Sequence, residues 1–485
     1  MVKPVGARWG RPDGVPQAPA ALTVVSRRSA LQALLAAYLL HPSVLSPLEA
    51  QTNPEGLAQQ AFDLFRGTAA DRQKALDALV ASGRADAAPI LILALRFAAT
   101  GHDTKLVNAL KKLTGANPGN DWAAWMLWQE AHPEIGVLPG FARLQARVYD
   151  LIDPNFQLFL SGEAKHEIRL EEITWGGVIK DGIPALTNPR LILASAASYL
   201  KADDLVFGVA INGDVRAYPL RIMDWHEMFN EVVGGVPVSL AYCTLCGSGI
   251  LFETSVEGRP QPFVFGSSGF LYRSNKLMYD TATHSLWNQF TGRPVVGRLT
   301  GSGIELKTRP VVIASWADWR ARHPNTKVLA LETGHRRDYS TGAAYGRYFA
   351  SPELMFPTNV DQSKLKQKDY VFALRSSGAE KAWPLTQFEG GAVINDRVGV
   401  LDLVLIGDAA TRTVRAYRAE GLIFEKGPSA DQVRRGEEVW RVTEEALVGP
   451  NGRSLSRLPG HVAYWFAWSG YFGHDGELGS SRADR

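Results

Sequence analysis

Two cysteines are separated by two residues in Ala241-Tyr242-Cys243-Thr244-Leu245-Cys246-Gly247, and they are the only cysteines of the 485-residue chain. Such a pair is typical of a metal-binding turn or of a redox dithiol. Alternating apolar residues predict one strand over 236–242 and another over 250–253, so the pair lies in a hairpin turn. A dithiol-exchange enzyme usually carries its first cysteine at a helix N-terminus. No helical pattern follows here, so the sequence favours metal binding over dithiol exchange.

A histidine and a glutamate precede the cysteines in Trp225-His226-Glu227-Met228-Phe229-Asn230, which we interpret as the start of a short helix. His226, Cys243 and Cys246 form a Cys₂His donor set that suits copper or zinc and leaves a position open for water or substrate. Glu227 would then act as an acid or base, or orient a ligand through a hydrogen bond. The run is not the H-E-x-x-H of a zincin, because Asn230 stands where the second histidine is needed.

A second group of polar and aromatic residues follows in the runs 265–272 and 275–280. We expect Tyr279 and Asp280 to be catalytic residues. The residues expected to line a substrate pocket are Trp287, Tyr272, Arg273 and His284. A tight turn between strands accounts for the same residues equally well. The serine elbow G-x-S-x-G and the phosphate loops are missing, which argues against a serine hydrolase and a nucleotide-binding enzyme.

The overall charge is nearly balanced, with 52 Lys and Arg against 49 Asp and Glu. This balance lacks the excess of positive charge that is typical of nucleic-acid-binding proteins. The length and the 46% of hydrophobic residues are enough for two or three domains with large cores.

The N-terminus resembles an export signal. Paired arginines, Arg27 and Arg28, precede an apolar run over 30–40 that is too short to span a bilayer, and Ala50 offers a cleavage point. We therefore predict a twin-arginine-like signal peptide over 1–50, a periplasmic or secreted protein, and no transmembrane span in the mature chain. In an oxidising compartment an unligated cysteine pair tends to close into a disulfide, so a disulfide stays an alternative to the metal.

The mature chain begins with helices. Apolar residues recur at helical spacing between Gly and Asp turns over 54–134, which predicts a HEAT-like helical stack over 51–140 that could bind a protein partner. A bridging helix is expected over 143–166. Short β runs with frequent Gly and Pro follow it.

The β-rich part contains an internal duplication. Residues 204–220 align without a gap on 369–385, and Trp287 and Gly297 correspond to Trp440 and Gly449. We expect an α+β fold, in which the helical stack precedes a pseudo-symmetric pair of barrel- or sandwich-like units, over 141–330 and 331–475, with a disordered tail over 476–485. His226, Glu227 and both cysteines have no counterparts in the second copy. The fold therefore stands without them, which points to function.

These motifs together resemble the domain-of-unknown-function family DUF3179, a group of mostly exported bacterial and archaeal proteins. The resemblance extends from about Ile173 to Tyr471. It rests on the runs Asp181-Gly182-Ile183-Pro184-Ala185-Leu186, Arg216-Ala217-Tyr218-Pro219-Leu220, Trp225-His226-Glu227, Tyr242-Cys243-Thr244-Leu245-Cys246-Gly247, Met278-Tyr279-Asp280 and Ser285-Leu286-Trp287-Asn288-Gln289. The family's usual turn has proline where this chain has Thr244. The resemblance implies export and a His-Glu plus Cys-x-x-Cys centre.

Our leading hypothesis is an exported metalloenzyme with a Cys₂His centre that acts on a small molecule or a protein. Soft thiolates favour copper slightly over zinc and an oxidoreductase over a hydrolase or lyase. Two alternatives stay open. One is a periplasmic dithiol/disulfide oxidoreductase, and the other is a non-enzymatic binding module with a structural disulfide.

Overall fold

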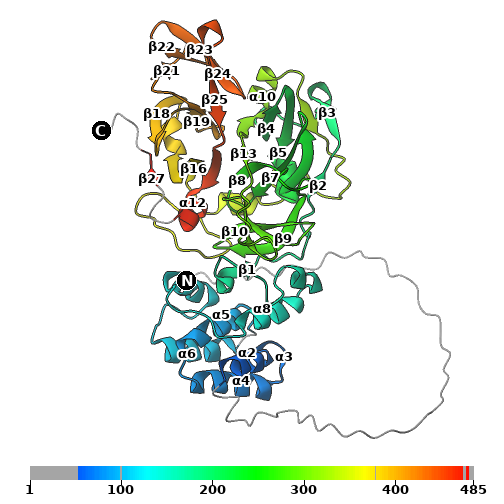
Figure 1. The fold of residues 1–485 in the computed structure, drawn as a ribbon, viewed down its shortest axis with the longest axis vertical. Helices are drawn as coiled ribbons and strands as arrows, with labels where there is room; N and C mark the ends of the chain where they lie inside the picture. The colour runs from blue at the N-terminus through cyan, green and yellow to red at the C-terminus, as the bar shows by residue number, and fades with distance from the viewer. Residues whose placement is uncertain (1–52, 99–100, 377, 473–476, 480–485) are drawn as a thin grey trace, which may run out of the picture. The chain divides into compact units, whose positions relative to one another are not determined.

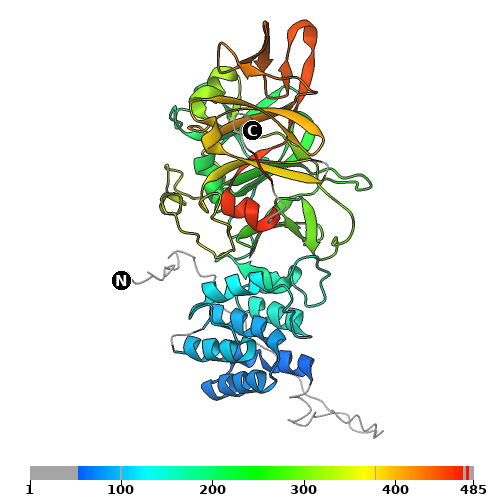
Figure 2. The same cartoon turned by 90° about the vertical axis from the view of Figure 1, so that its left-hand side faces the viewer.

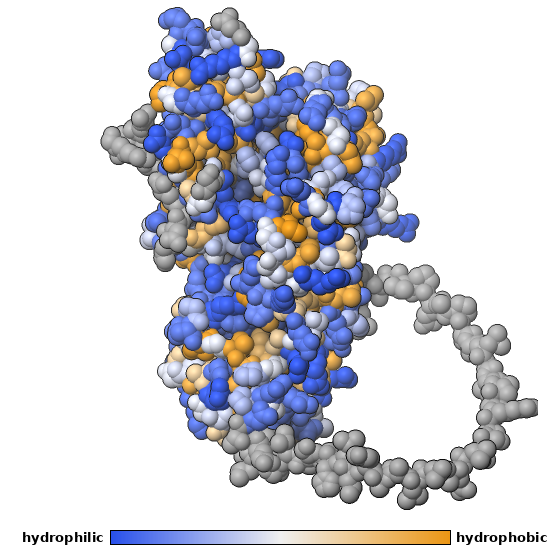
Figure 3. Space-filling model, in the orientation of Figure 1, coloured by the Kyte–Doolittle hydropathy of each residue, from blue (hydrophilic) through white to orange (hydrophobic). Residues whose placement is uncertain are grey.

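The computed structural model describes residues 53–98, 101–376, 378–472 and 477–479. The predicted export signal over 1–50 lies outside the described residues, as does the predicted tail apart from 477–479. Within the described ranges, no helix combines the length and the apolar character that a membrane span needs. Figure 3 shows polar side chains over most of the visible face, interrupted by small apolar patches.

The first part is helical, as predicted (Figure 1). Its helices are α2 (Pro54–Gln60), α3 (Asp63–Arg66), α4 (Ala69–Ala81), α5 (Ala88–Arg96), α6 (Asp103–Thr114), α7 (Trp122–Ala131) and α8 (Phe141–Asp150). Local sequence sets their ends: Thr68 and Asp71 form a capping box before α4, and Gly115 ends α6 in the left-handed conformation. Helix α5 is buried on nearly every side and forms the centre of the stack.

The predicted bridging helix over 143–166 is wrong in its extent. Helix α8 ends at Asp150, and Asp153 then caps a short 3₁₀ turn that begins at Pro154. Proline cannot donate the backbone hydrogen bond that would continue a helix, so the chain turns here.

The first β-rich unit, residues 173–330, contains three five-stranded sheets. One sheet has the order β14-β4-β5-β15-β3, a second β13-β8-β7-β6-β2, and a third β1-β9-β10-β11-β12. The strands are β1 (Ile173–Trp175), β2 (Leu186–Thr187), β3 (Leu191–Leu193), β4 (Leu205–Ile211), β5 (Asp214–Pro219), β6 (Met228–Val233), β7 (Val236–Cys243), β8 (Ser248–Glu253), β9 (Phe265–Tyr272), β10 (Asn275–Asp280), β11 (Leu286–Asn288), β12 (Arg293–Val296), β13 (Thr308–Arg309), β14 (Val312–Ser315) and β15 (Lys327–Leu329). Helices α9 (Leu220–His226) and α10 (Trp316–Arg322) complete the unit.

The second β-rich unit, residues 370–479, contains a four-stranded sheet, β26-β16-β17-β27, and a barrel-like eight-stranded sheet. The order of the larger sheet is β18-β19-β20-β25-β24-β23-β22-β21. The strands are β16 (Tyr370–Ser376), β17 (Ala379–Pro384), β18 (Ala392–Val398), β19 (Leu401–Asp408), β20 (Thr413–Arg418), β21 (Glu425–Lys426), β22 (Gln432–Arg435), β23 (Glu438–Val442), β24 (Ala446–Val448), β25 (Ser454–Leu458), β26 (His461–Tyr464) and β27 (Glu477–Leu478). Helix α12 (Trp465–Phe472) follows β26, and a linker, residues 331–369 with α11 (Gly346–Ala350), joins the units.

The predicted duplication is confirmed and is longer than the sequence suggested. Strand pairs in the first unit recur in the second with the same register and a constant shift: Phe207 pairs with Tyr218, and Phe372 with Trp383. The same shift holds in the next hairpin, where Cys243 pairs with Ser248 and Asp408 with Thr413. The two copies therefore match without a gap over 204–253 and 369–418.

Hydrogen bonds outside the strand ladders repeat as well. Asn230 exchanges two hydrogen bonds with the backbone of Phe265, and Asn395 does the same with Phe424. Phe265 and Phe424 each meet a buried tryptophan edge to face, Trp287 or Trp440. Figures 1 and 2 show the two β-rich units, the first mainly green and the second yellow to red. The α+β class with a pseudo-symmetric β-rich pair is thus confirmed.

Candidate functional site

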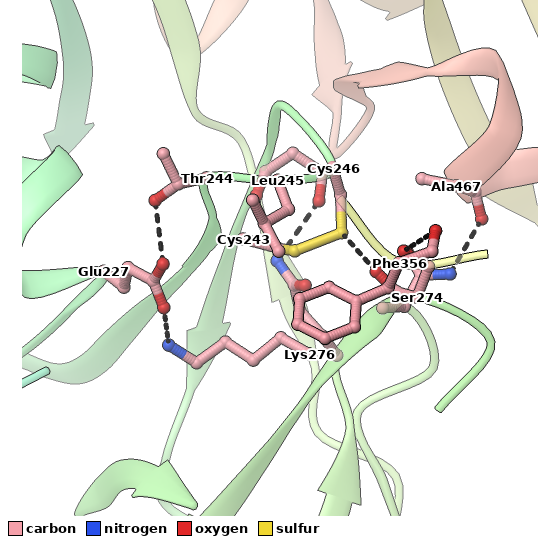
Figure 4. The surroundings of a disulfide bond; sticks show 12 residues. Glu227, Cys243, Thr244, Leu245, Cys246, Ser274, Lys276, Phe356 and Ala467 are labelled. Carbon is pink, nitrogen blue, oxygen red and sulfur yellow. Dashed lines mark hydrogen bonds and ion pairs between the residues drawn. A yellow bond between two sulfur atoms is a disulfide. The ribbon is translucent and has the colours of Figure 1, made fainter. Parts of the chain in front are cut away.

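The cysteine turn joins β7 to β8, as predicted. Cys243 is the last residue of β7, and the N–H of Gly247 donates to the carbonyl of Thr244. Gly247 has φ 61°, and a Cβ there would come within 3.0 Å of the Tyr370 ring. Glycine is therefore favoured for both its conformation and its lack of a side chain. In this turn Cys243 and Cys246 form a disulfide, with Cα atoms 5.2 Å apart (Figure 4).

The disulfide is buried: Cys243 is 2% exposed and Cys246 is 0% exposed. Its apolar surroundings include Met278, Trp287 and Phe356. The Cys246 Sγ lies 3.6 Å from the carbonyl oxygen of Ser274 in the β9–β10 turn. A reagent can therefore reach the sulfurs only if some of these neighbours move.

A buried ion pair lies beside the turn. The Lys276 Nζ is 2.7 Å from one carboxylate oxygen of Glu227, and the Thr244 hydroxyl donates to the other over 2.9 Å. Lys276 is 4% and Glu227 is 7% exposed. Thr244 follows Cys243 directly, so its hydroxyl ties the ion pair to the cysteine turn. Figure 4 shows this group on the Cys243 side of the disulfide.

The backbone around Glu227 explains its position. Helix α9 ends at His226, and Glu227 takes the left-handed conformation with φ 54° while its N–H donates to Met223 O over 2.7 Å. The carbonyl of Glu227 accepts from the N–H of Tyr242 over 2.7 Å. The sequence interpretation of a helix starting at 225 is therefore wrong, because His226 ends a helix and Met228 begins strand β6.

A second carboxyl group lies one helical turn before Glu227. Asp224 is 8% exposed and accepts a 3.1 Å hydrogen bond from the Tyr242 hydroxyl. Burial raises the pKa of Asp224 to about 7, and the nearby Glu227 charge raises it further. The hydrogen bond from Tyr242 and the charge of Arg412 lower this pKa without cancelling the effect of burial. Asp224 is thus a buried carboxyl that can hold a proton near neutral pH.

The His226 ring is engaged on both nitrogens. Nδ1 lies 2.8 Å from Pro184 O, and Nε2 lies 2.6 Å from the hydroxyl of Tyr339 in the linker. Burial lowers the pKa of His226 to about 4, so the ring is neutral at pH 7. Among the described residues, no three or more His, Cys, Asp or Glu side chains are grouped so as to hold a metal ion. The structure thus places the Glu227 side chain beside the cysteine turn. The His226 ring bonds Pro184 and Tyr339 instead, and His226 is connected to the turn through the next residue, Glu227.

Tyr279 and His284 lie together, on the opposite face of β10 from Lys276. The Tyr279 hydroxyl donates to Asp181 over 2.7 Å, and its ring packs against Phe159 and His284. Burial raises the pKa of Tyr279 to about 12. Successive residues of a strand point to opposite faces, so Tyr279 points away from the disulfide.

Asp280 and Trp287 stabilise the turn between β10 and β11. The Asp280 carboxylate accepts from the backbone N–H of Thr283 at 2.6 Å, from the Thr283 hydroxyl at 2.7 Å and from the indole N–H of Trp287 at 2.9 Å. Trp287 is fully buried. These contacts account for both residues as parts of the hairpin.

Tyr272 and Arg273 belong to the β9–β10 turn. Arg273 and Ser274 occupy its two corners with φ 47° and 60°, a conformation that usually takes Asn or Gly. The guanidinium of Arg273 pairs with buried Glu172 at 2.6 Å, and the Tyr272 ring packs edge to face on Tyr471. The strained turn thereby holds the Ser274 carbonyl against Cys246.

The linker covers the site at three points. Besides the contact of Tyr339 with His226, the Tyr348 hydroxyl donates to Leu245 O over 2.7 Å, and the Ser274 hydroxyl donates to Phe356 O over 3.3 Å. Tyr348 and Phe356 share the apolar cluster of the cysteines. The linker therefore closes the disulfide off from solvent.

Comparison with known families gives a clear result. The family described as "Protein of unknown function (DUF3179)" matches residues 180–475, which is more than half of the chain. The chain belongs to the DUF3179 family. No curated protein and no solved structure matches it. The DUF3179 region contains the disulfide, the Glu227–Lys276 pair and both copies of the duplication from β4 onward.

Sequence reasoning missed Lys276, Thr244 and the linker tyrosines. The sequence contains one signal that could have identified Lys276. Strand alternation in 275–280 places this lysine on the same face as Met278 and Asp280, in a strand whose residues are all buried. A lysine in such a strand needs a carboxylate partner. Nothing in the sequence names Glu227 as that partner.

Asp224→Asn should change how stability depends on pH. The folded-state pKa of about 7 lies above the ordinary value of 3.8, so the folded protein binds an extra proton between these values. Asp224 therefore lowers stability progressively as pH rises from about 4 to about 7, and asparagine removes this penalty. We expect the variant to gain stability relative to the parent on going from pH 5 to pH 8, measured by urea unfolding at each pH. An equal difference at both pH values would contradict the raised pKa.

Proposed function

We propose that this protein is a thiol–disulfide oxidoreductase whose redox centre is the Cys243–Cys246 pair. The observation that carries the proposal is the second copy, which keeps the same turn without sulfur. Asp408 and Thr411 stand at the positions of Cys243 and Cys246, and the register of the flanking strands is unchanged. Arg412, at the position of Gly247, has φ 54° and donates its N–H to Ala409, as Gly247 does to Thr244. The fold thus makes this turn with no disulfide.

The disulfide also contributes little to the stability of the fold. Its cysteines are only three positions apart, and the chain-entropy relation gives such a short loop about 2 kcal/mol, at the low end for disulfides. The turn already has its own backbone hydrogen bonds, and the N–H of Tyr464 in the second unit donates to Cys246 O over 2.8 Å.

The chemistry is exchange with a dithiol. A substrate thiolate attacks one sulfur, a mixed disulfide forms and the other cysteine leaves as a thiolate; the substrate's second thiol then attacks and closes the substrate disulfide. Two electrons and two protons pass from the substrate to the protein. The ion pair of Lys276 and Glu227 is linked to the turn through Thr244. In this proposal the lysine favours the leaving thiolate, and the glutamate accepts or returns a proton. The second copy has Ala392 at the position of Glu227 and keeps neither cysteine.

Export fits this chemistry, because disulfides persist in oxidising compartments. The proposal therefore keeps the periplasmic or secreted location that the N-terminal sequence predicts. The copper or zinc centre stays a separate prediction: it needs the reduced thiols and a His226 ring released from Tyr339.

Titration of the folded protein tests the redox role. In glutathione buffers of graded potential, followed by alkylation and mass measurement, we expect one reversible transition that adds two alkyl groups. Its potential should lie above the range of structural disulfides, which is below about −300 mV. Cys243→Ser and Cys246→Ser should each abolish it. A disulfide that is reduced only when the protein unfolds would show that its role is purely structural.

Glu227→Gln should slow reduction of the disulfide by about 10-fold or more near pH 7, because the proton-transfer group is lost. Stopped-flow reduction with a dithiol measures this rate. Asp396→Asn is the matched control, since it removes a buried carboxylate paired with Lys381 in the second unit. Equal slowing by both variants would contradict a specific role. If Glu227→Gln unfolds the protein, Glu227→Gln with Lys276→Met removes both charges and should show the same loss of rate.

Tyr348→Phe should speed reduction several-fold. The change removes the hydrogen bond from the linker to Leu245 O, so the linker opens more often and the sulfurs are exposed more often. The same reduction assay and hydrogen exchange over 331–369 measure both effects. Tyr417→Phe removes a comparable hydroxyl bond to Thr443 O in the second unit and should leave the rate unchanged. A rate unaltered by Tyr348→Phe would rule out this contact as the barrier to access.

A further inference from the structure

A cavity of about 440 Å³ opens among the helices of the N-terminal part, apart from the disulfide. Its size lies within the range of small-molecule sites. It is lined by residues from α3, α4, α5, α6 and α8 and from the segments that follow α5 and α8: Leu64, Phe65, Ala69, Arg72, Gln73, Ala94, Phe97, Ala98, His102, Lys105, Val148, Leu151 and Ile152. Neither the duplication nor the redox centre accounts for it.

One part of the cavity wall is apolar. Phe65, Val148 and Ile152 lie along it, together with Phe97 and Leu151, which are 37% and 41% exposed. Large apolar side chains exposed in a concave site commonly mark a ligand surface. An aliphatic chain placed here would remove this apolar surface from water, which favours binding.

The polar part of the wall carries basic groups, and no aspartate or glutamate lines the cavity. Arg72 donates to Gly67 O over 2.6 Å, and Lys105 donates to the side-chain oxygen of Gln73 over 2.9 Å. The buried Nε2 of His102 has no hydrogen-bond partner among the described residues. Arg72, His102 and Lys105 all line the same cavity. Burial and the charges of Arg72 and Lys105 lower the pKa of His102, and the charge of the adjacent Asp103 opposes this effect.

We propose that this cavity binds an anionic amphiphile, namely a monocarboxylate with a medium-length alkyl chain. The carboxylate lies against Arg72 and Lys105 and accepts a hydrogen bond from His102, while the alkyl chain covers Phe97 and Leu151. The cluster of basic groups without an acidic lining residue selects against neutral and cationic amphiphiles. The site is independent of the proposed redox function, and it gives the helical part a ligand of its own.

Calorimetric titration of the full-length protein with decanoate, below its micelle concentration, tests this proposal. Decanol and decyltrimethylammonium serve as neutral and cationic probes of the same chain length. We expect decanoate to bind at one site and both comparison probes to bind at least about 10-fold more weakly, a difference of 1.4 kcal/mol. Equal binding of decanol and decanoate would overturn the anion selectivity, and no binding of decanoate would overturn the site.

Variants locate the site. Arg72→Gln and Lys105→Gln should each weaken decanoate binding about 5-fold or more, whereas Lys74→Gln, an exposed change on the same helix α4, should leave it unchanged. Ala69→Phe adds a ring from an exposed position at the start of α4 and should block the cavity without disturbing the core. Because Arg72 also holds the end of α3, circular dichroism must show each variant folded. Unchanged binding in folded Ala69→Phe would show that decanoate binds elsewhere.

Discussion

The contact between the two β-rich units is the constraint on which the candidate site depends. The N–H of Tyr464, at the end of β26, donates to Cys246 O at 2.8 Å, and the hydroxyl of Thr413, at the start of β20, donates to Ile313 O at the same distance. Each unit thus contacts the hairpin of the other. Residues of the second unit thereby join those of the first unit and the linker, such as Met278 and Phe356, in burying the cysteine turn.

Burial then determines what the side chains can do. A lysine and a glutamate inside a protein are stable only as a pair with further hydrogen bonds, and Glu227 has both Lys276 and Thr244. The same low-polarity surroundings keep Asp224 protonated up to about pH 7 and keep His226 neutral. One copy of the duplicated backbone carries His226, Glu227 and Cys243, and the other carries Gly391, Ala392 and Asp408 at the corresponding positions.

Sequence periodicity and the internal repeat were enough to predict the helical part, strands β7 and β8 and the duplicated pair, because these depend on local patterns. The state of the sulfurs was not predictable, since metal ligands and disulfides share the same C-x-x-C spacing. The helix over 225–230 was predicted wrongly because a left-handed Glu227 is not visible in residue types. The partners of His226 and Glu227, at Tyr339 and Lys276, are 113 and 49 residues away, and only the folded chain brings them together.

The same contacts decide how a thiol can reach a buried disulfide. Opening the unit–unit contact breaks a backbone hydrogen bond and exposes the apolar cluster around the cysteines, which includes Ala463, Trp465 and Trp468 from the second unit. Opening the linker breaks side-chain hydrogen bonds such as that of Tyr348 and withdraws Tyr348 and Phe356 from the same cluster, but it leaves the strand ladders of both units in place. Under the proposed redox function, access through the linker leaves the pseudo-symmetric pair intact, so reduction of the disulfide does not require global unfolding.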